Sequence, residues 1–275
     1  MNVWKKVLLD CSVQVERFYH GQDETHHDPE EETAPYYALN FVEQGNFQLQ
    51  VGREKWILDE RKIFVTHPTM NYRFSHFEER PTDVCLSIKF SEDLAEEIFS
   101  LSDFNLKTLS PVILLNNRLA YLRWQIARLV EIADNAMEVE TLAAEMLSAA
   151  GINTTEQKIY NTRQLGWYAE RVEAICHLFE KQYEDKHSLN SISRFVGMSS
   201  FHLTRVFREL TNQTPHQFLI NIRLIKAAEY LLDGVSVTEV CFACGFNNLS
   251  YFIRLFQRNF GVTPLQFQKK KIKAD

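Results

Sequence analysis

The chain has 275 residues, of which 45% are hydrophobic and 12% aromatic, enough for a folded core and, by length, for two domains. No apolar run approaches the ~20 residues of a membrane-spanning helix, so a membrane protein is not expected. The apolar run after Lys5-Lys6 ends at Asp10 and is too short for a signal peptide. The cytoplasm is therefore the predicted location. The net charge of −6 is unevenly spread, because residues 188–275 carry +6 and residues 1–187 carry −12. A basic end on an acidic body predicts that only the C-terminal end meets a polyanion.

The five cysteines form an odd and scattered set, which argues against a disulfide framework. Cys241 and Cys244 make a Cys-x-x-Cys, but no second pair or nearby histidine completes a zinc site. Both lie in an apolar stretch with helical spacing, so we interpret them as small residues of a buried core.

The N-terminal half opens with an acidic segment, residues 23–33, interpreted as a solvated arm or loop. From Tyr36 to Phe90 the hydrophobic period is close to two, with turn signals at Gly45-Asn46 and Gly52-Arg53. Many short, closely spaced strands predict a small antiparallel barrel or sandwich. The expected strands cover residues 38–42, 47–51, 55–58, 62–65 and 84–88.

Helical patterns take over at Ser91-Glu92-Asp93, which has the composition of a capped helix start. Amphipathic helices are expected over residues 119–133, 139–150 and 164–183, with a polar linker over residues 151–163. The predicted fold is therefore α+β, with a strand-rich domain over residues 1–160 and an all-α domain over residues 161–275.

An internal repeat occupies the C-terminal domain. Gly197 matches Gly245 at an offset of 48 residues, and a further set of matches follows at an offset of 49. One module is therefore used twice, with one extra residue in the second turn. The matches at 49 are Arg205 with Arg254, Phe207 with Phe256, Thr214 with Thr263, Pro215 with Pro264 and Phe218 with Phe267.

The first copy has the pattern of a helix-turn-helix. A short helix over residues 189–196 is followed by the turn Gly197-Met198-Ser199 and by a second helix, for which Ser200 is the expected cap. Leu203, Val206, Phe207 and Leu210 form one apolar stripe on that helix. The opposite face is predicted to enter the major groove, and its candidate DNA contacts are Phe201, Thr204, Arg205 and Arg208.

The second copy repeats the arrangement, with a helix over residues 237–244, the turn Gly245-Phe246-Asn247 and a second helix that buries Phe252, Leu255 and Phe256. Arginine can bond guanine bidentately, and asparagine or glutamine can do so with adenine. The candidate DNA contacts are Asn247, Asn248, Ser250, Arg254, Gln257 and Arg258. Arg205 and Arg254 also fit ordinary surface charges.

A helix over residues 216–232 joins the copies, between Pro215 and Gly234 as start and stop signals. Its expected buried stripe is Phe218, Ile222, Ile225 and Leu232. At ~1.5 Å per residue it spans about 25 Å. Such a rod suits two reading helices about one DNA turn, ~34 Å, apart.

The stretch from Leu189 to Gln268 closely resembles the DNA-binding domain of the AraC/XylS family. The resemblance implies seven helices, asymmetric DNA half-sites, a bacterial transcription factor and, usually, activation through contact with RNA polymerase. Asn212 stands where the family often has glycine, and asparagine tolerates the left-handed backbone. The motifs that carry the resemblance are Val240-Cys241, Gly245-Phe246, Ser250-Tyr251-Phe252, Arg254-Leu255-Phe256, Phe260-Gly261 and Thr263-Pro264.

The N-terminal part resembles the cupin-like sensing domain of the same family, through Leu39-Asn40-Phe41-Val42, Gly45, Gly52-Arg53, Ile63-Phe64-Val65 and Pro68. The family's Pro-Gly-Asp turn is absent from residues 59–62. The resemblance implies an antiparallel β-barrel with a pocket for a small-molecule effector such as a sugar, and a homodimer formed through residues 119–150. The candidate pocket residues are Gln44, Tyr72, Phe74, Cys85 and Ser87, for which plain core packing is the open alternative.

Other classes of function are less well supported. His20, His26, His27, His67 and His76 contain no His-x-His pair, so no metal and no other cofactor is expected. Without a metal triad or a catalytic carboxylate pair the chain is not expected to be an enzyme. A transcription factor controlled by a protein partner and a cupin enzyme fused to a DNA-binding domain remain as alternatives, and Lys269-Lys270-Lys271 is either a solvated tail or a phosphate contact.

Overall fold

The structure is a computed structural model that describes residues 4–10, 12–19, 30–76, 83–101, 105–132, 136–151 and 159–272. The chain divides into two compact units, residues 1–165 and 166–275, and each is described by itself. Several expectations lie outside the described residues: most of the acidic segment 23–33, His20, His26, His27, the middle of the linker and the side chains of Lys270 and Lys271.

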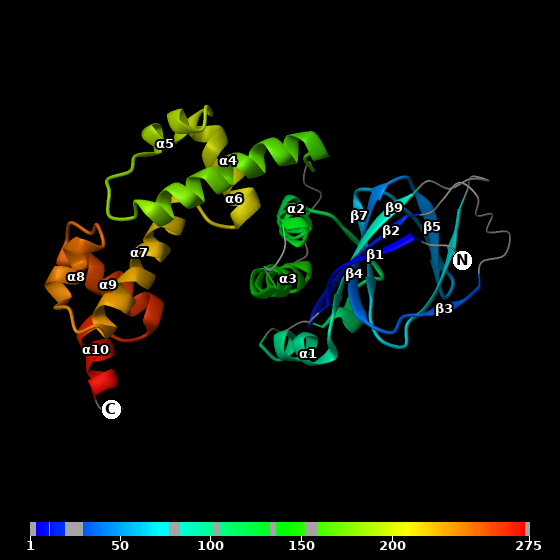
Figure 1. Cartoon of the computed structure of the whole chain (residues 1–275), viewed down its shortest axis with the longest axis horizontal. Helices are drawn as coiled ribbons and strands as arrows, with labels where there is room; N and C mark the ends of the chain where they lie inside the picture. Colours follow the sequence, from blue (N-terminus) through cyan, green and yellow to red (C-terminus); the bar gives the residue numbers. More distant parts are fainter. Residues whose placement is uncertain are drawn as a thin grey trace. The chain divides into compact units, whose positions relative to one another are not determined.

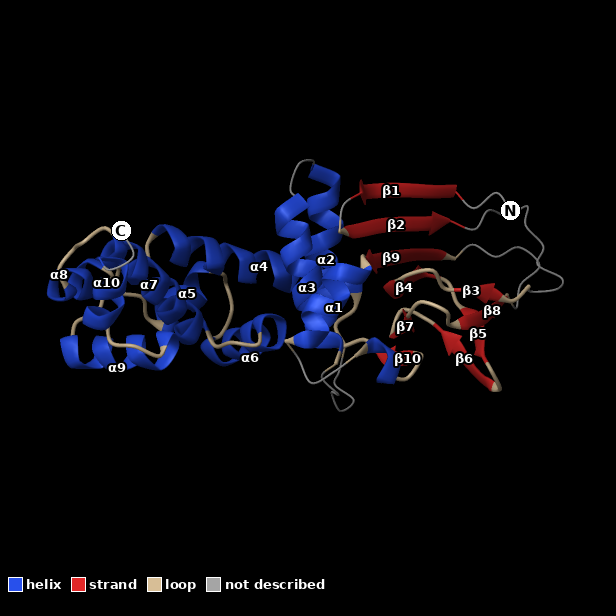
Figure 2. Ribbon diagram, turned by 90° about the horizontal axis from the view of Figure 1, so that it is seen from below, coloured by secondary structure: helices blue, strands red, loops and turns tan. Residues whose placement is uncertain are grey.

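Two antiparallel sheets make up the N-terminal unit (Figure 2). The strand order is β1-β2-β9-β4-β7-β10 in the six-stranded sheet and β3-β8-β5-β6 in the four-stranded sheet. The strands are β1 (Trp4–Asp10), β2 (Val13–Tyr19), β3 (Glu32–Thr33), β4 (Tyr37–Gln44), β5 (Phe47–Val51), β6 (Glu54–Leu58), β7 (Lys62–Thr66), β8 (Asn71–Ser75), β9 (Val84–Phe90) and β10 (Val112–Leu114).

This topology does not confirm the predicted cupin-like barrel. Within the described ranges no strand pairing joins the two sheets, so the unit is open at its edges and has the layered form of a sandwich. The five predicted strands all form, as β4, β5, β6, β7 and β9. Strand β2 was not predicted, although its sequence Val-Gln-Val-Glu begins with regular alternation.

The central strand β4 of the six-stranded sheet is buried on both faces, which explains why it is apolar along most of its length. Val42 and Phe64 face the four-stranded sheet and pack with Phe47, Leu49 and Leu58. On the other face, the guanidinium of Arg123 lies 5.6 Å from the ring centroid of Phe41. A sheet covered on one side by strands and on the other by helices cannot show the simple alternation of a half-exposed strand.

Three helices, α1 (Glu92–Ser100), α2 (Asn117–Ile132) and α3 (Ala136–Ala150), and the 3-10 turn η1 (Leu106–Thr108) complete this unit. Ser91 caps α1 as predicted, since its side chain accepts a hydrogen bond from the Leu94 amide. The apolar faces of α2 and α3 are already covered within one chain: Leu122, Ile126, Ala143 and Met146 are fully buried. Exposed apolar surface is therefore not by itself a reason to expect a dimer through these helices.

The C-terminal unit is helical (Figure 1). Seven helices are found in its described part: α4 (Thr162–Lys181), α5 (Leu189–Phe195), α6 (Ser200–Thr211), α7 (Pro215–Leu232), α8 (Val237–Ala243), α9 (Leu249–Phe260) and α10 (Pro264–Ile272). No helix in the described part of the chain is long and apolar enough to cross a membrane.

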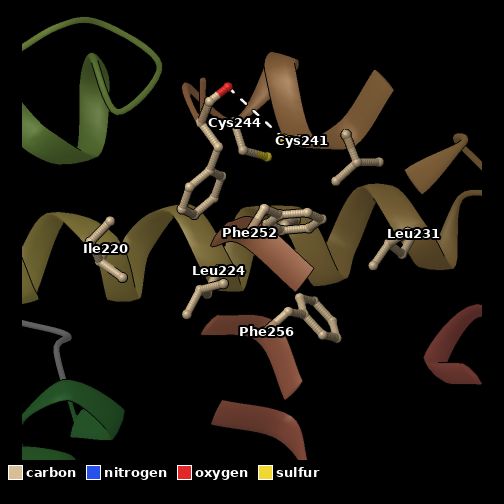
Figure 3. Packing of buried hydrophobic residues seen from close by; sticks show 10 residues of the cluster. Ile220, Leu224, Leu231, Cys241, Cys244, Phe252 and Phe256 are labelled. Atoms are coloured by element: carbon tan, nitrogen blue, oxygen red, sulfur yellow. Dashed lines mark hydrogen bonds between the residues drawn. The ribbon is translucent and has the colours of Figure 1, made fainter. Parts of the chain in front are cut away.

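The core of the second half gathers side chains from α7, α8 and α9 (Figure 3). Cys241 and Cys244 are fully buried in it, as predicted. The buried side chains of α7 in this core are Ile220, Leu224, Ala227 and Leu231.

The predicted stripe on α7 was wrong. Ile225 is 56% exposed and Leu232 is 40% exposed. The observed stripe lies on another side of a helix that is apolar around much of its circumference, so spacing alone did not identify the face that packs against α8 and α9.

Candidate nucleic-acid interface

The first helix-turn-helix unit consists of α5 and α6. Ser188 caps α5 in a capping box with Ser191. Ser199, not the predicted Ser200, caps α6, because its side chain accepts a hydrogen bond from the His202 amide. The Ser200 hydroxyl instead donates to Ser193 Oγ at 3.1 Å, and Ser193 is buried at the junction of the two helices.

The second unit consists of α8 and α9. Ser236 caps α8, and Asn248 caps α9 by accepting a hydrogen bond from the Tyr251 amide. On α9, Phe252 and Phe256 are fully buried, whereas Leu255 is only partly buried. The two phenylalanine rings lie 5.8 Å apart, edge to face, and anchor α9 in the core of Figure 3.

The repeat predicted from sequence is also a repeat of hydrogen bonds. In the turns, the Met198 amide donates to the Ser193 carbonyl at 2.9 Å and the Phe246 amide donates to the Cys241 carbonyl at 3.0 Å. Asn212 and Gly261 end the two second helices in the left-handed conformation, with φ of 59° and 74°. The Asn212 prediction is thereby confirmed, and the two units are built alike at both ends of each reading helix.

The buried stripe of α6 is the predicted one: Leu203, Val206, Phe207 and Leu210 are all inaccessible to solvent. Phe201 is 82% exposed, and Arg205 and Arg208 are exposed on the same helix. Thr204 is half-buried, and its hydroxyl donates to the Ser200 carbonyl at 2.9 Å. The exposed face of α6 therefore presents mainly the aromatic ring of Phe201 and the side chains of Arg205 and Arg208.

The corresponding face of α9 is richer in polar groups. Ser250, Arg254, Gln257 and Arg258 are exposed, as is Asn247 in the preceding turn. Asn248 is also exposed, but its Oδ1 is occupied by the capping bond to the Tyr251 amide at 2.8 Å. The predicted residues of the second unit thus lie along one side of α9 and in the turn that precedes it.

The two reading helices differ in charge. Arg205 on α6 lies 3.9 Å from the carboxylate of Glu209, one turn later. Helix α9 carries Arg254 and Arg258 and no acidic residue. Helix α9 therefore carries the less neutralised cationic charge of the two reading helices, and a phosphate group would be attracted to it more strongly.

The predicted effector residues fall into two groups. Tyr72, Phe74 and Cys85 pack against the core between the two sheets, and Phe74 lies 5.0 Å from Phe47, ring to ring. Gln44 is exposed, and Ser87 is buried with its hydroxyl donating to Asn40 Oδ1 at 2.7 Å.

Burial raises the pKa values of Tyr72 and Cys85, so both side chains are neutral near pH 7. Among the described side chains no group of three histidine, cysteine or carboxylate residues is placed to hold a metal ion.

One link between α7 and the segment between α4 and α5 had no signal in the sequence. Arg223 of α7 donates from Nε to the Tyr183 carbonyl at 2.6 Å and from Nη2 to the Asp185 carbonyl at 2.8 Å. The partners are about 40 positions apart in the chain and are backbone atoms, so neither periodicity nor a motif marks them.

Residues 192–270 match a family model described as a helix-turn-helix domain. The chain is 23% identical over 219 residues to the HTH-type transcriptional regulator YbfI of Bacillus subtilis, covering 78% of both proteins. It is 22% identical over 242 residues to the Msm operon regulatory protein of Streptococcus mutans, covering 85% of this chain and 84% of the relative. A probable AraC family transcriptional regulator from Rhodopseudomonas palustris, a solved structure, is 25% identical over 37% of this chain and 97% of its own, with a TM-score of 0.36.

These similarities agree with the duplicated unit described above. The match covers both reading helices, and the two relatives, which extend over most of the chain, are both named as regulators. Residues 192–270 are thus a helix-turn-helix domain of the AraC type, and the relatives that extend over most of the chain are transcriptional regulators.

Proposed function

We propose that the protein binds specific operator sequences with both helix-turn-helix units and activates transcription. The observation that carries the proposal is the duplicated unit, in which α6 and α9 are capped and buried alike while Phe201, Arg205, Ser250, Arg254 and Gln257 remain accessible. Accessible arginine, glutamine and serine side chains on a helix can bond base edges in the major groove.

The distance between the two units supports simultaneous reading. Helix α7 has 18 residues, which corresponds to about 27 Å at ~1.5 Å per residue. Two reading helices at the ends of such a rod suit neighbouring major-groove segments on one face of the duplex, about one turn apart. We propose that α9 supplies most of the polar base contacts and that α6 reads shape and thymine methyl groups through Phe201.

Residues 161–275 are proposed to be the DNA-binding domain and residues 1–160 to be the controlling domain. The sensed signal is proposed to be a small molecule such as a sugar. Tyr72 supports this, because its hydroxyl sits 2.9 Å from Glu32 Oε2 at the edge of the inter-sheet core and is a polar group next to aromatic surface.

Control by a protein partner is a second candidate. The ring of Phe74 lies 5.0 Å from that of Phe47 and 5.7 Å from that of Phe64, and such close packing favours a filled interior. Sugars that stabilise the protein in a thermal-shift screen would support the first candidate. A lack of response, combined with capture of one defined protein, would support the second.

We also propose, because of the family resemblance, that the protein forms a homodimer and contacts RNA polymerase. No enzymatic activity is proposed. We propose that the protein is located in the cytoplasm, where bacterial regulators of chromosomal genes act.

Genome-wide immunoprecipitation tests the proposed function. It is expected to recover a shared sequence motif upstream of a few transcription units whose transcripts fall when the protein is deleted. Binding without a shared motif would contradict sequence-specific recognition. Transcripts that rise on deletion would contradict activation and leave DNA reading intact.

A further inference from the structure

Arg223 connects the second helix-turn-helix unit to the segment that precedes the first. Its guanidinium bonds two carbonyls of residues 182–188, the segment between α4 and α5, at 2.6 and 2.8 Å. The same guanidinium carbon lies 5.8 Å from the ring centroid of Phe246, in the turn of the second unit. One side chain on the connecting helix therefore contacts both the turn of the second unit and the segment that leads into the first.

The two turn glycines, which are equivalent in the repeat, differ in their surroundings. Both have positive φ, 66° at Gly197 and 78° at Gly245. A Cβ at Gly197 would meet nothing within 4 Å, whereas a Cβ at Gly245 would lie 2.5 Å from the Glu184 carbonyl oxygen and 2.9 Å from Arg223 Nη2. The turn of the second unit is therefore docked on residues 182–188, and the turn of the first unit is open.

Further bonds hold the segment 182–188 in place. The Tyr183 and Tyr230 hydroxyls lie 3.2 Å apart, which joins the segment to the far half of α7. The His187 ring bonds the Gln182 carbonyl at 2.7 Å and packs on Phe179 of α4. A segment tied at several points gives Arg223 and Gly245 a fixed surface against which to set the second unit.

We propose that Arg223 is a positioning residue that fixes the second unit relative to the first and thereby determines which spacing between two DNA boxes the protein accepts. The inference rests on the proposed reading of DNA by both units. Helix α7 alone is a single connection about which the second unit could twist. The docking of Gly245 and Arg223 on residues 182–188 adds a second connection, and two connections between two bodies restrict rotation far more than one.

Spacing is a sensitive readout of such a restriction. Each added base pair separates the boxes by about 3.4 Å and rotates one against the other by about a tenth of a turn. A rigid protein that fits one spacing must give up contacts in one box when the spacing changes, whereas a loosened one can follow the DNA. None of the contacts given above for Arg223 involves the exposed faces of α6 or α9, so its loss should leave the bases preferred within each box unchanged.

The test uses the full chain and a DNA library that keeps both wild-type boxes and varies the spacer from two base pairs shorter to two longer. For the wild-type protein we expect affinity to fall about tenfold or more for a change of one base pair. Arg223→Met keeps the apolar stem and removes the donors. With this variant, a spacer change of one base pair should lower the affinity only about threefold or less. The base preferences within each box should be unchanged. Arg223→Lys, which retains a charged donor, should restore part of the penalty.

A matched pair of glycine variants provides the second measurement. Gly197→Ala and Gly245→Ala impose a similar backbone strain, but only the second pushes against the Glu184 carbonyl. We expect Gly245→Ala to flatten or shift the spacing profile and Gly197→Ala to preserve it. If circular dichroism shows that Arg223→Met does not fold, the comparison of Gly245→Ala with Gly197→Ala tests the inference in its place.

Two results would overturn the inference. One is a wild-type spacing profile in Arg223→Met or in Gly245→Ala. The other is a loss of affinity by the same factor at every spacing. A wild-type protein indifferent to spacing would contradict the premise that the units are held rigidly. Randomising one box at a time then separates two loosely joined units, which lose affinity with either box, from a protein that reads one box only, and only the second result contradicts the proposed function.

Discussion

Ser199 and Asn248, 49 residues apart, cap the two reading helices in the same way: each side-chain oxygen accepts a hydrogen bond from the backbone amide three residues later. The distances are 3.3 Å to His202 and 2.8 Å to Tyr251. An N-cap satisfies an amide that the helix itself leaves unpaired. Asn248 therefore has a structural role whether or not its amide group also reaches DNA.

Replacing Asn248 separates these roles. Asn248→Ala removes the cap and should lower the free energy of unfolding of the C-terminal unit by ~1 kcal/mol. Asn248→Ser, which copies the residue used in the first unit, should keep most of that stability. Thermal melts of both variants measure the capping role, and their affinities for the operator measure the contact with DNA. If the serine variant is as stable as wild type and binds DNA less well, the Asn248 amide contacts DNA; equal destabilisation by both changes would contradict capping as the main role.

Arg205 and Arg254 are expected to specify different clusters of bases. Arg205→Ala should relax the sequence preference in one cluster and Arg254→Ala in the other, each at a cost of ~1–3 kcal/mol. The effect of Arg254 should be the larger, because Arg205 lies 3.9 Å from Glu209 and already has a partner. Binding selections on randomised DNA provide the measurement. Unchanged motifs with a uniform loss of affinity would show that the arginines contact phosphates.

The thiols of Cys241 and Cys244 should be unreactive in the folded protein. Both are fully buried, and burial raises the pKa of Cys244 to about 11, so the thiolate that reacts with alkylating agents is scarce at neutral pH. Mass-spectrometric peptide mapping after iodoacetamide treatment should find these residues labelled only after denaturation. Fast labelling under native conditions would contradict their place in the core.

The full-length protein is predicted to be a dimer formed through residues 119–150. Leu122, Ile126, Ala143 and Met146 are buried within the chain, so the contact must use the remaining surface of α2 and α3, where Met137 is 80% exposed. Met137→Glu should then weaken dimerisation without unfolding the protein. Light scattering at tens of micromolar measures it. A strict monomer with and without DNA would rule out the dimer.

Patterns confined to one element predicted much of this fold. The duplicated helix-turn-helix, the stripe from Leu203 to Leu210, the left-handed Asn212 and the burial of Cys241 all depend on neighbours a few positions away, and all appear in the structure. The choice of Ser200 over Ser199 as a cap failed because two adjacent serines have the same chemistry, and only the backbone at Ser199, with φ of −70° and ψ of 148°, selects between them.

Relations between distant elements were not predictable in this way. On α7, Phe218, Ile222, Ile225 and Leu232 make as regular a stripe as Ile220, Leu224, Ala227 and Leu231, and only the position of α8 and α9 makes the second the buried one. The open two-sheet form of the N-terminal unit likewise depends on which strands meet at the edges. The contact of Arg223 with two carbonyls leaves no trace in composition or spacing.

Simultaneous reading of DNA by the two helix-turn-helix units of a basic domain is the central premise of the proposed function. Hydroxyl-radical footprinting of an operator by the full-length protein, repeated at several salt concentrations, tests it directly. The account predicts two protected clusters centred about 10 base pairs apart on one face of the duplex, and an affinity that falls steeply and linearly on a log–log plot against salt. A single protected cluster, or an affinity indifferent to salt, would contradict it.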